Sequence, residues 1–225
     1  MKVFIGVGHG GADSGAVGNG FKEKALNLQI ALACRDCLVR HGVVVGMSRT
    51  TDENDPLSEE IKECNAFSPD FAIDIHNNAG GGDGAEIFYH YKGGESKTLA
   101  QYVLNEIVRI GQNSRGIKTR LNASGKDYYG FIRETHAPAI IVECAFIDNA
   151  NDIKIIDTVA EQKAMGEAIA KGILNALEIE YKENKSSKIY RVQVGAFEKK
   201  SNADNMLANL KAAGFDGFIV EGEKV

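Results

Sequence analysis

The sequence lacks the features that mark several large classes of protein. It has no block of basic residues and carries a formal net charge of −5, whereas binding to the phosphates of a nucleic acid needs clustered Lys and Arg. It also has no apolar run long enough to cross a bilayer. We therefore expect no nucleic acid partner and no insertion into a membrane.

Neither a secretory leader nor a disulfide framework is expected from the sequence. The first residues, MKVFIGVGHGGADSG, pass from one Lys and a short apolar run directly into glycines and charges, which is not the pattern of a signal peptide. We expect synthesis in the cytoplasm. Four cysteines are too few for a disulfide scaffold in 225 residues. Cys34 and Cys37 form a C-x-x-C within a helical run and lack a second such pair, which favours two core residues over a zinc or redox site.

Apolar runs alternate with amphipathic ones through most of the chain. This pattern is typical of an α/β fold in which helices cover both faces of a largely parallel sheet. Strands are expected at VFIGVG, VVVGM, FAIDIH, AEIFYHY and AIIVE, and helices at about 23–40, 57–67, 96–111 and 151–177.

The composition changes near residue 178. The stretch EIEYKENKSSK is polar and rich in Lys, as linkers are. A strand, helix and strand are then expected at IYRVQVGAF, SNADNMLANLKAAG and FDGFIV, a βαβ module too small to hold a core alone. We therefore divide the chain into a main domain (1–178), a linker (179–188) and a small C-terminal module (189–225).

Three of the expected strands end in side chains that can bind a metal or transfer a proton. VFIGVG is followed by His9, FAIDI by His76, and AIIV by Glu143. Because ligands of open α/β sheets bind at the carboxyl ends of the strands, we expect these three residues to share one crevice.

Two imidazoles suit zinc, which typically takes three protein ligands at a catalytic site. Glu23 is the best third ligand, because it opens a helix just after the glycine-rich loop that carries His9. Asp13, Asp74 and Glu134 compete for the role, and Asp74 could instead orient the His76 imidazole from behind. Glu143 would then be free to take a proton from an attacking water and return it to a leaving nitrogen.

The segments HGGADSGAVGNGFKEKALNLQIA, DIHNNA and PAIIVECAFIDNANDIKII resemble the zinc-dependent N-acetylmuramoyl-L-alanine amidases of the amidase-3 family, in the family's order. The resemblance implies a hydrolase of the amide bond between N-acetylmuramic acid and the first L-alanine of the peptidoglycan stem peptide. It also implies a single α/β domain with a mixed, mostly parallel sheet. The family's zinc ligands map onto His9, Glu23 and His76, and its catalytic Glu maps onto Glu143.

The chain departs from the family's usual motifs at two places. Gly6, Val7 and Gly8 stand where Asp-Pro-Gly is common, and Asp74 stands where many members have Ser. The hydrogen bonds behind His9 and His76 are therefore expected to differ from those of the family.

Two further residues are expected to contact substrate. One is Asn77, beside His76, and the other is Arg133 in YYGFIRETHAPA, which could bind a peptide carboxylate. The alternative for Arg133 is a side chain that simply faces solvent.

The tail YRVQVGAFEKKSNADNMLANLKAAGFDGFIV resembles the start of a sporulation-related repeat, a module associated with binding septal peptidoglycan. Either the repeat is truncated or another chain completes it, so a homodimer through this module is an open alternative. Without a signal peptide, the enzyme is expected to reach the wall after phage lysis or mother-cell lysis. The rival hypotheses are another zinc amidohydrolase or peptidase, and a wall-binding protein with a degenerate site.

Overall fold

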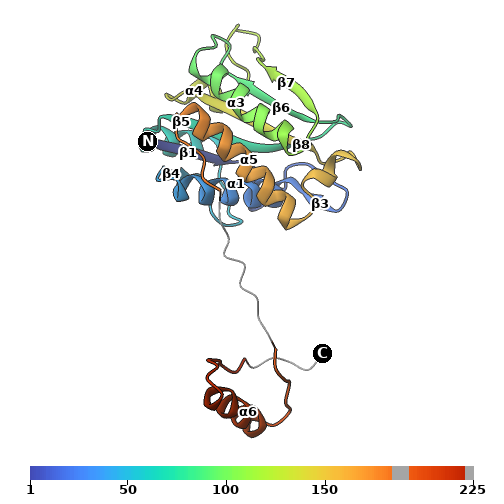
Figure 1. Cartoon of the computed structure of the whole chain (residues 1–225). Helices are drawn as coiled ribbons and strands as arrows, with labels where there is room; N and C mark the ends of the chain where they lie inside the picture. Colours follow the sequence, from blue (N-terminus) through green and yellow to red (C-terminus); the bar gives the residue numbers. More distant parts are fainter. Residues whose placement is uncertain (184–192, 221–225) are drawn as a thin grey trace. The chain divides into compact units, whose positions relative to one another are not determined.

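The computed structural model describes residues 1–183 and 193–220, in two units, Met1–Lys182 and Glu183–Val225 (Figure 1). The first unit contains a sheet of six strands: β1 (Lys2–Val7), β4 (Val44–Met47), β5 (Phe71–Asn78), β6 (Ala85–Tyr89), β7 (Ser114–Lys118) and β8 (Ala139–Phe146). Its helices are α1 (Glu23–Arg40), α2 (Leu57–Phe67), α3 (Glu95–Arg109), α4 (Gly130–Glu134) and α5 (Val159–Ala176), with a 3-10 turn, η1 (Asp152–Ile155). A short hairpin of β2 (Val17–Gly18) and β3 (Phe21–Lys22) precedes α1.

The strands lie in the order β4-β1-β5-β8-β6-β7. The first four run parallel to one another, β6 is antiparallel to β8, and β7 is parallel to β6. The mixed, mostly parallel sheet that the resemblance implied is thus confirmed. Because β1, β5 and β8 are neighbours with the same direction, their carboxyl ends meet at one edge of the sheet.

Both faces of the sheet are covered, which explains why the strands are apolar at consecutive positions. Along β1, Val3 and Ile5 belong to the larger core beneath α1, α3 and α5, whereas Phe4 belongs to a smaller core beneath α2 and α4. Figure 1 shows α1, α3 and α5 together in front of the sheet. Cys34 and Cys37 are free thiols buried in the larger core, as the helical context predicted.

The helix expected at 151–177 is divided in two. Residues 152–155 form the 3-10 turn, and α5 begins only after Thr158. The Thr158 hydroxyl accepts from the backbone N–H of Glu161, while the Glu161 side chain accepts from the Thr158 N–H. This capping box satisfies two otherwise unpaired donors and fixes the start of the helix.

The residues that directly follow α5 belong to the first unit and pack against its core. Ile179 and Tyr181 contact its core, and the Tyr181 ring stacks on His41 with centroids 5.2 Å apart. The Tyr181 hydroxyl also donates to Glu167 over 3.1 Å. The polar composition had assigned these residues to the linker.

The described part of the second unit contains one helix, α6 (Lys200–Ala212), where the sequence predicts it. The strand expected at 215–220 is not formed, nor is one formed at 193–197. The remainder of the first expected strand lies outside the described residues. A strand needs a neighbour to pair its backbone groups, and here Phe215 and Phe218 are exposed. Among the described helices, none has the length and apolar character needed to span a bilayer.

Close packing between α3 and α5 predicts the effect of one substitution. A Cβ at Gly172 would lie 2.4 Å from Cα of Val103, so Gly172→Ala must push the two helices apart. We expect a loss of about 1–3 kcal/mol in the free energy of unfolding, although Ala favours a helix by about 1 kcal/mol over Gly. Urea unfolding would measure it. Lys163→Ala, at an exposed position of α5, is the control and should change stability by less than about 0.5 kcal/mol. Equal stability of Gly172→Ala and the parent chain would contradict the expectation.

Candidate metal centre

The carboxyl edge of β1, β5 and β8 brings together the residues that the sequence singled out. His9 follows β1, while His76 and Glu143 lie directly opposite each other in the pairing of β5 with β8. Glu23, the first residue of α1, reaches the same edge because the loop after His9 folds back onto it.

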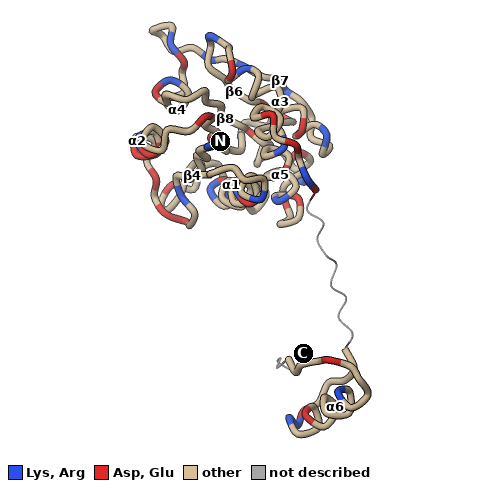
Figure 2. The backbone as a smooth tube through the Cα atoms, turned by 60° about the vertical axis from the view of Figure 1, so that its left-hand side comes forward, with Lys and Arg blue, Asp and Glu red and all other residues tan. Residues whose placement is uncertain are grey.

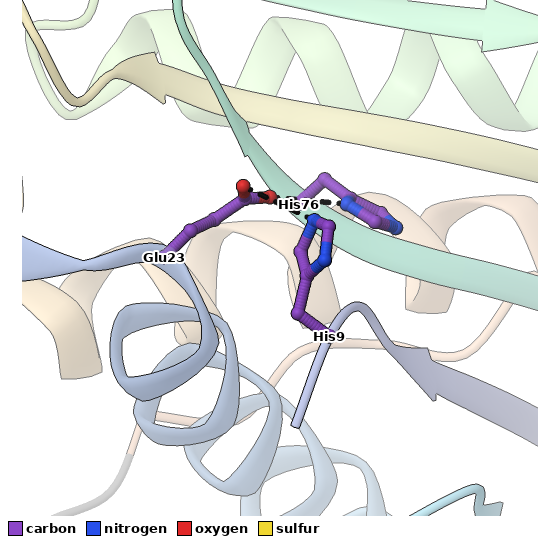
Figure 3. Close-up of side chains that lie close together, drawn as sticks. All are labelled: His9, Glu23 and His76. Carbon is purple, nitrogen blue, oxygen red and sulfur yellow. Dashed lines mark hydrogen bonds and ion pairs between the residues drawn. The ribbon is translucent and has the colours of Figure 1, made fainter. Parts of the chain in front are cut away.

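His9, Glu23 and His76 form a compact group (Figure 3). Each offers one ligand atom, and these atoms lie within 4.8 Å of one another. His9 Nε2 is 3.1 Å from Glu23 Oε2, and His76 Nδ1 is 3.1 Å from Glu23 Oε1. The two imidazole rings stand nearly perpendicular, with centroids 5.1 Å apart. Two imidazole nitrogens and one carboxylate are a ligand set that a catalytic zinc takes from a protein.

Glycines at two positions of the loop allow the three side chains to approach one another closely. A Cβ at Gly8 would lie 2.1 Å from the His76 ring, and one at Gly15 would lie 2.6 Å from both Glu23 Oε2 and the His9 ring. His9 itself has φ of +64°, a left-handed conformation that is uncommon outside glycine. Such strain persists only where the surrounding structure enforces it, and it concentrates at functional sites.

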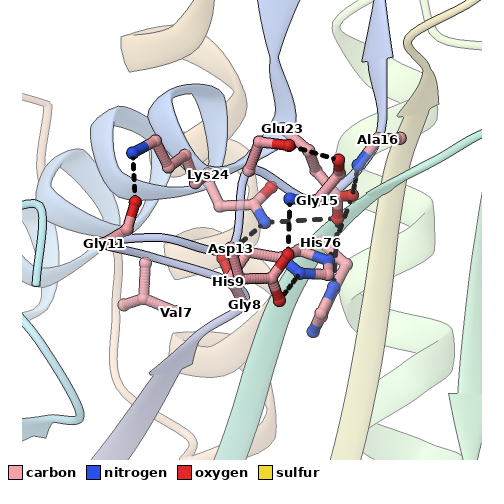
Figure 4. A network of polar contacts seen from close by, with 12 residues as sticks. Val7, Gly8, His9, Gly11, Asp13, Gly15, Ala16, Glu23, Lys24 and His76 are labelled. Atoms are coloured by element: carbon pink, nitrogen blue, oxygen red, sulfur yellow. Dashed lines mark hydrogen bonds and ion pairs between the residues drawn. The ribbon is translucent and has the colours of Figure 1, made fainter. Parts of the chain in front are cut away.

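Backbone and side-chain donors hold Glu23 in place (Figure 4). Its carboxylate is 4% exposed and accepts from the backbone N–H groups of Ala16 over 2.9 Å and Asn77 over 3.1 Å. Asn27, one helical turn further along α1, donates to Glu23 Oε1 and to the carbonyl of Gly8. These contacts fix the carboxylate between the two imidazoles.

The other carboxylates considered as the third ligand contact different groups. Asp13 Oδ2 lies 2.8 Å from Nδ1 of His9, and Asp74 Oδ2 lies 3.1 Å from Nε2 of His76. Each therefore contacts the imidazole nitrogen that faces away from Glu23, as partners that orient metal-binding histidines do. Glu134 forms an ion pair with Arg133 instead.

The electrostatics of the group favour positive charge at its centre. The hydrogen bond to Glu23 is the main cause that raises the pKa of His9. Burial would lower the pKa of His76, but the charge of Asp74 and hydrogen bonds to Asp74 and Glu23 raise it well above its usual value. Burial would raise the pKa of Glu23, yet the hydrogen bonds from the two imidazoles bring it well below its usual value. A metal cation would supply the same positive charge, so the donor set fits one.

Two supporting residues carry no motif that sequence reasoning could have used. Asn27 shows only as a polar residue four positions after Glu23 on a helical face. Arg49 is 2% exposed and donates to the carbonyls of Val7 and Gly8, which hold the base of the His9 loop. A buried Arg satisfied by carbonyl groups leaves no trace in a single sequence.

Glu143 lies beside the His–Glu–His group and is bound differently. Its side chain is partly exposed, but Oε2 is buried and has no hydrogen-bond partner among the described residues. Burial raises the pKa of Glu143 to about 7, although the charge of His76 opposes the shift. A carboxyl group with a pKa near neutrality can both accept and donate a proton.

The expected substrate contacts are engaged by protein groups. Asn77 is 2% exposed and donates to Asn27 over 2.8 Å. The Arg133 guanidinium donates to the carbonyls of Asp127 and Tyr128 at 2.8 and 2.9 Å. Both side chains thus support the structure around the site, and their contact with substrate stays a prediction.

The mixed sheet thus carries at its edge three donors that can hold a metal ion. Residues 3–175 match the family model of N-acetylmuramoyl-L-alanine amidases, and residues 163–223 match that of the SPOR domain. The chain belongs to the N-acetylmuramoyl-L-alanine amidase family.

Relatives and solved structures agree with this assignment. The chain is 36% identical to the sporulation-specific N-acetylmuramoyl-L-alanine amidase of Bacillus subtilis, over 98% of this chain and 84% of the relative. It is similar in structure to Cwp6 from Clostridium difficile, with a TM-score of 0.77 and 40% identity over 78% of this chain and 29% of that one. It is also similar to an N-acetylmuramoyl-L-alanine amidase of Clostridium difficile 630, with a TM-score of 0.72 and 33% identity over 79% and 96% of the two chains.

The raised pKa of Glu143 predicts a pH-dependent effect on stability. Between its usual value of 4.5 and about 7, the folded metal-free chain holds a proton that the unfolded chain has lost, so the stability that Glu143 contributes falls as pH rises. Glu143→Gln removes this titration. We expect the metal-free variant to gain about 2 kcal/mol over the parent chain between pH 4.5 and 7.5, which is less than the full shift of about 3 kcal/mol because the side chain is partly exposed.

Urea unfolding of both chains after chelation, at several pH values, would measure this gain. A stability difference between them that does not change with pH would show that Glu143 titrates normally.

Proposed function

We propose that the chain hydrolyses the amide bond between N-acetylmuramic acid and the first L-alanine of the peptidoglycan stem peptide, with zinc held by His9, Glu23 and His76 and with Glu143 as the general base. The observation that carries the proposal is the unpartnered carboxyl oxygen of Glu143 beside the His–Glu–His group. Membership of the amidase family supports the choice of bond.

The three donors define how a metal would be held. His9 would offer Nε2 and His76 would offer Nδ1, since the opposite nitrogen of each ring faces Asp13 or Asp74. Zinc bound there supplies Lewis acidity, which polarises a carbonyl and lowers the pKa of water. Loss of the imidazole protons on metal binding would follow from the raised pKa values.

Glu143 would carry the proton during the reaction. Its Oε2 accepts the proton of the attacking water, and the same carboxyl group then donates it to the departing alanine nitrogen. In the metal-free chain the pKa of about 7 leaves both forms of Glu143 accessible at neutral pH, and a cation held nearby would favour the ionised form that accepts a proton. Burial of Oε2 limits the access of bulk water to that proton.

Aromatic and cationic side chains between β7 and β8 are candidates for contact with the stem peptide. The Tyr129 ring packs against Phe88. Burial is the main cause that raises the pKa of Tyr129, and the charge of Glu143 adds to the increase. Arg120 lies over the Tyr128 ring, 3.8 Å from its centroid. We propose that these side chains, together with Arg133, face a substrate that carries carboxylates.

The C-terminal part of the chain would hold the enzyme on its polymeric substrate. Its match to the SPOR domain supports contact with peptidoglycan glycan. Dimerisation through this part, and release to the wall by phage lysis or mother-cell lysis, stay predictions that rest on the sequence.

Digestion of purified peptidoglycan provides the direct test of the activity. Incubation with the zinc-loaded chain should release free stem peptides that begin with L-alanine, as identified by mass spectrometry. A chelator should stop the release and added Zn²⁺ should restore it, because the chemistry needs the metal. Fragments cut at another amide would indicate a different peptidase or amidohydrolase, and intact substrate would indicate a binding role.

Replacement of Glu143 separates proton transfer from metal binding. Glu143→Gln should bind zinc like the parent chain, yet its turnover should fall by about 10²- to 10⁴-fold, the usual contribution of a general base. Zinc content and release of stem peptides would be measured on the same sample. Glu95→Gln, an exposed residue at the start of α3, is the matched control. Unchanged turnover of Glu143→Gln would exclude the role.

A further inference from the structure

Helix α2 carries several acidic side chains (Figure 2), and one of them points into the protein. Glu59 and Glu63 are exposed, whereas Glu60 is only 5% exposed. Its Oε1 atom is buried and has no hydrogen-bond partner recorded among the described residues, and the same holds for Oδ1 of Asp74 on β5. Orphaned buried carboxyl oxygens are costly, so their position needs a reason.

The absence of a side chain at Gly6 brings these two carboxyl groups together. Gly6 on β1 is the direct register partner of Asp74 on β5. A Cβ at Gly6 would lie 1.9 Å from Glu60 Oε1 and 2.9 Å from Asp74 Oδ1. The two orphaned oxygens therefore occupy the same small space above the glycine backbone.

A buried carboxyl group that faces a second carboxyl group is disfavoured as an anion. Burial, followed by the charge of Asp74, raises the pKa of Glu60 well above its usual value. Glu60 is thus the neutral partner, and it can donate a hydrogen bond to Asp74.

Asp74 connects this pair to the metal centre. Its other oxygen, Oδ2, lies 3.1 Å from His76 Nε2, and His76 Nδ1 lies 3.1 Å from Glu23. A continuous series of contacts therefore runs from α2 through Asp74 to the imidazole. Gly6 and Asp74, which are paired between β1 and β5, are the two positions that create the contact with Glu60.

We propose that Glu60 is a positioning residue of the metal centre: it donates to Asp74, which in turn keeps His76 oriented with Nδ1 towards Glu23 and the metal. The proposal rests on the metal site described under the proposed function. Partners behind metal-binding histidines typically change metal affinity when they are removed.

Zinc affinity of the purified full chain tests the proposal without reference to activity. Competition with a chromophoric chelator gives the dissociation constant for Zn²⁺. Glu60→Leu should weaken binding by about 10- to 100-fold, because Asp74 loses its donor. Glu60→Gln should stay within about threefold of the parent chain, since its amide can still donate. Glu63→Leu, the same change on the exposed face of α2, should have no effect.

A double variant identifies the route. In an Asp74→Ala background, Glu60→Leu should weaken zinc binding no further, because Glu60 acts only through Asp74. Unfolding of the metal-free variants by urea shows whether each is folded, and Glu60→Met takes the place of Glu60→Leu if the latter is not.

The outcomes separate this inference from the proposed metal site. If the parent chain binds zinc and Glu60→Leu binds it equally well, the role of Glu60 is overturned while the metal site stands. An equal loss in Glu60→Leu and Glu60→Gln would also overturn it, since the hydrogen bond to Asp74 would not be the cause. Failure of the parent chain to bind zinc would overturn the metal site itself, and the inference with it.

Discussion

The buried carboxylate of Glu23 is the group on which the arrangement of the site depends. A charge that is 4% exposed is stable only when donors surround it. Here the donors come from the loop after β1, from the backbone of β5 and from two imidazoles. Glu23 also opens α1, where the helix dipole favours an anion. One charge therefore ties a loop, a helix and a strand together at the carboxyl edge of the sheet.

Much of this arrangement could be predicted from the sequence, because it follows from the direction of the strands. The apolar runs that end at His9, His76 and Glu143 belong to three neighbouring parallel strands. Because the carboxyl ends of such strands lie at the same edge of the sheet, the proximity of these side chains could be predicted without knowledge of how the helices pack. Glu23 was harder to choose, since spacing alone did not say which of several carboxylates turns inwards.

The parts that could not be predicted depend on contacts between distant segments. The edge strand β7 has the sequence SRGIK, which lacks the alternation of a half-buried strand. Arg49 supports the His9 loop through backbone carbonyls, which leave no signature in the residue types nearby. Asp13 and Asp74 were weighed as ligands, and only the side-chain geometry shows that they contact the far nitrogens of the imidazoles.

The contact at Gly6 also limits how this chain can evolve. A Cβ at position 6 would lie 1.9 Å from Oε1 of Glu60, the end of a flexible side chain, so a larger residue there is accommodated only if the Glu60 carboxyl group moves away. Positions 6, 60 and 74 are therefore coupled, because a side chain at position 6 would occupy the space that the carboxyl oxygens of Glu60 and Asp74 share. A substitution at any one of the three changes the surroundings of the other two.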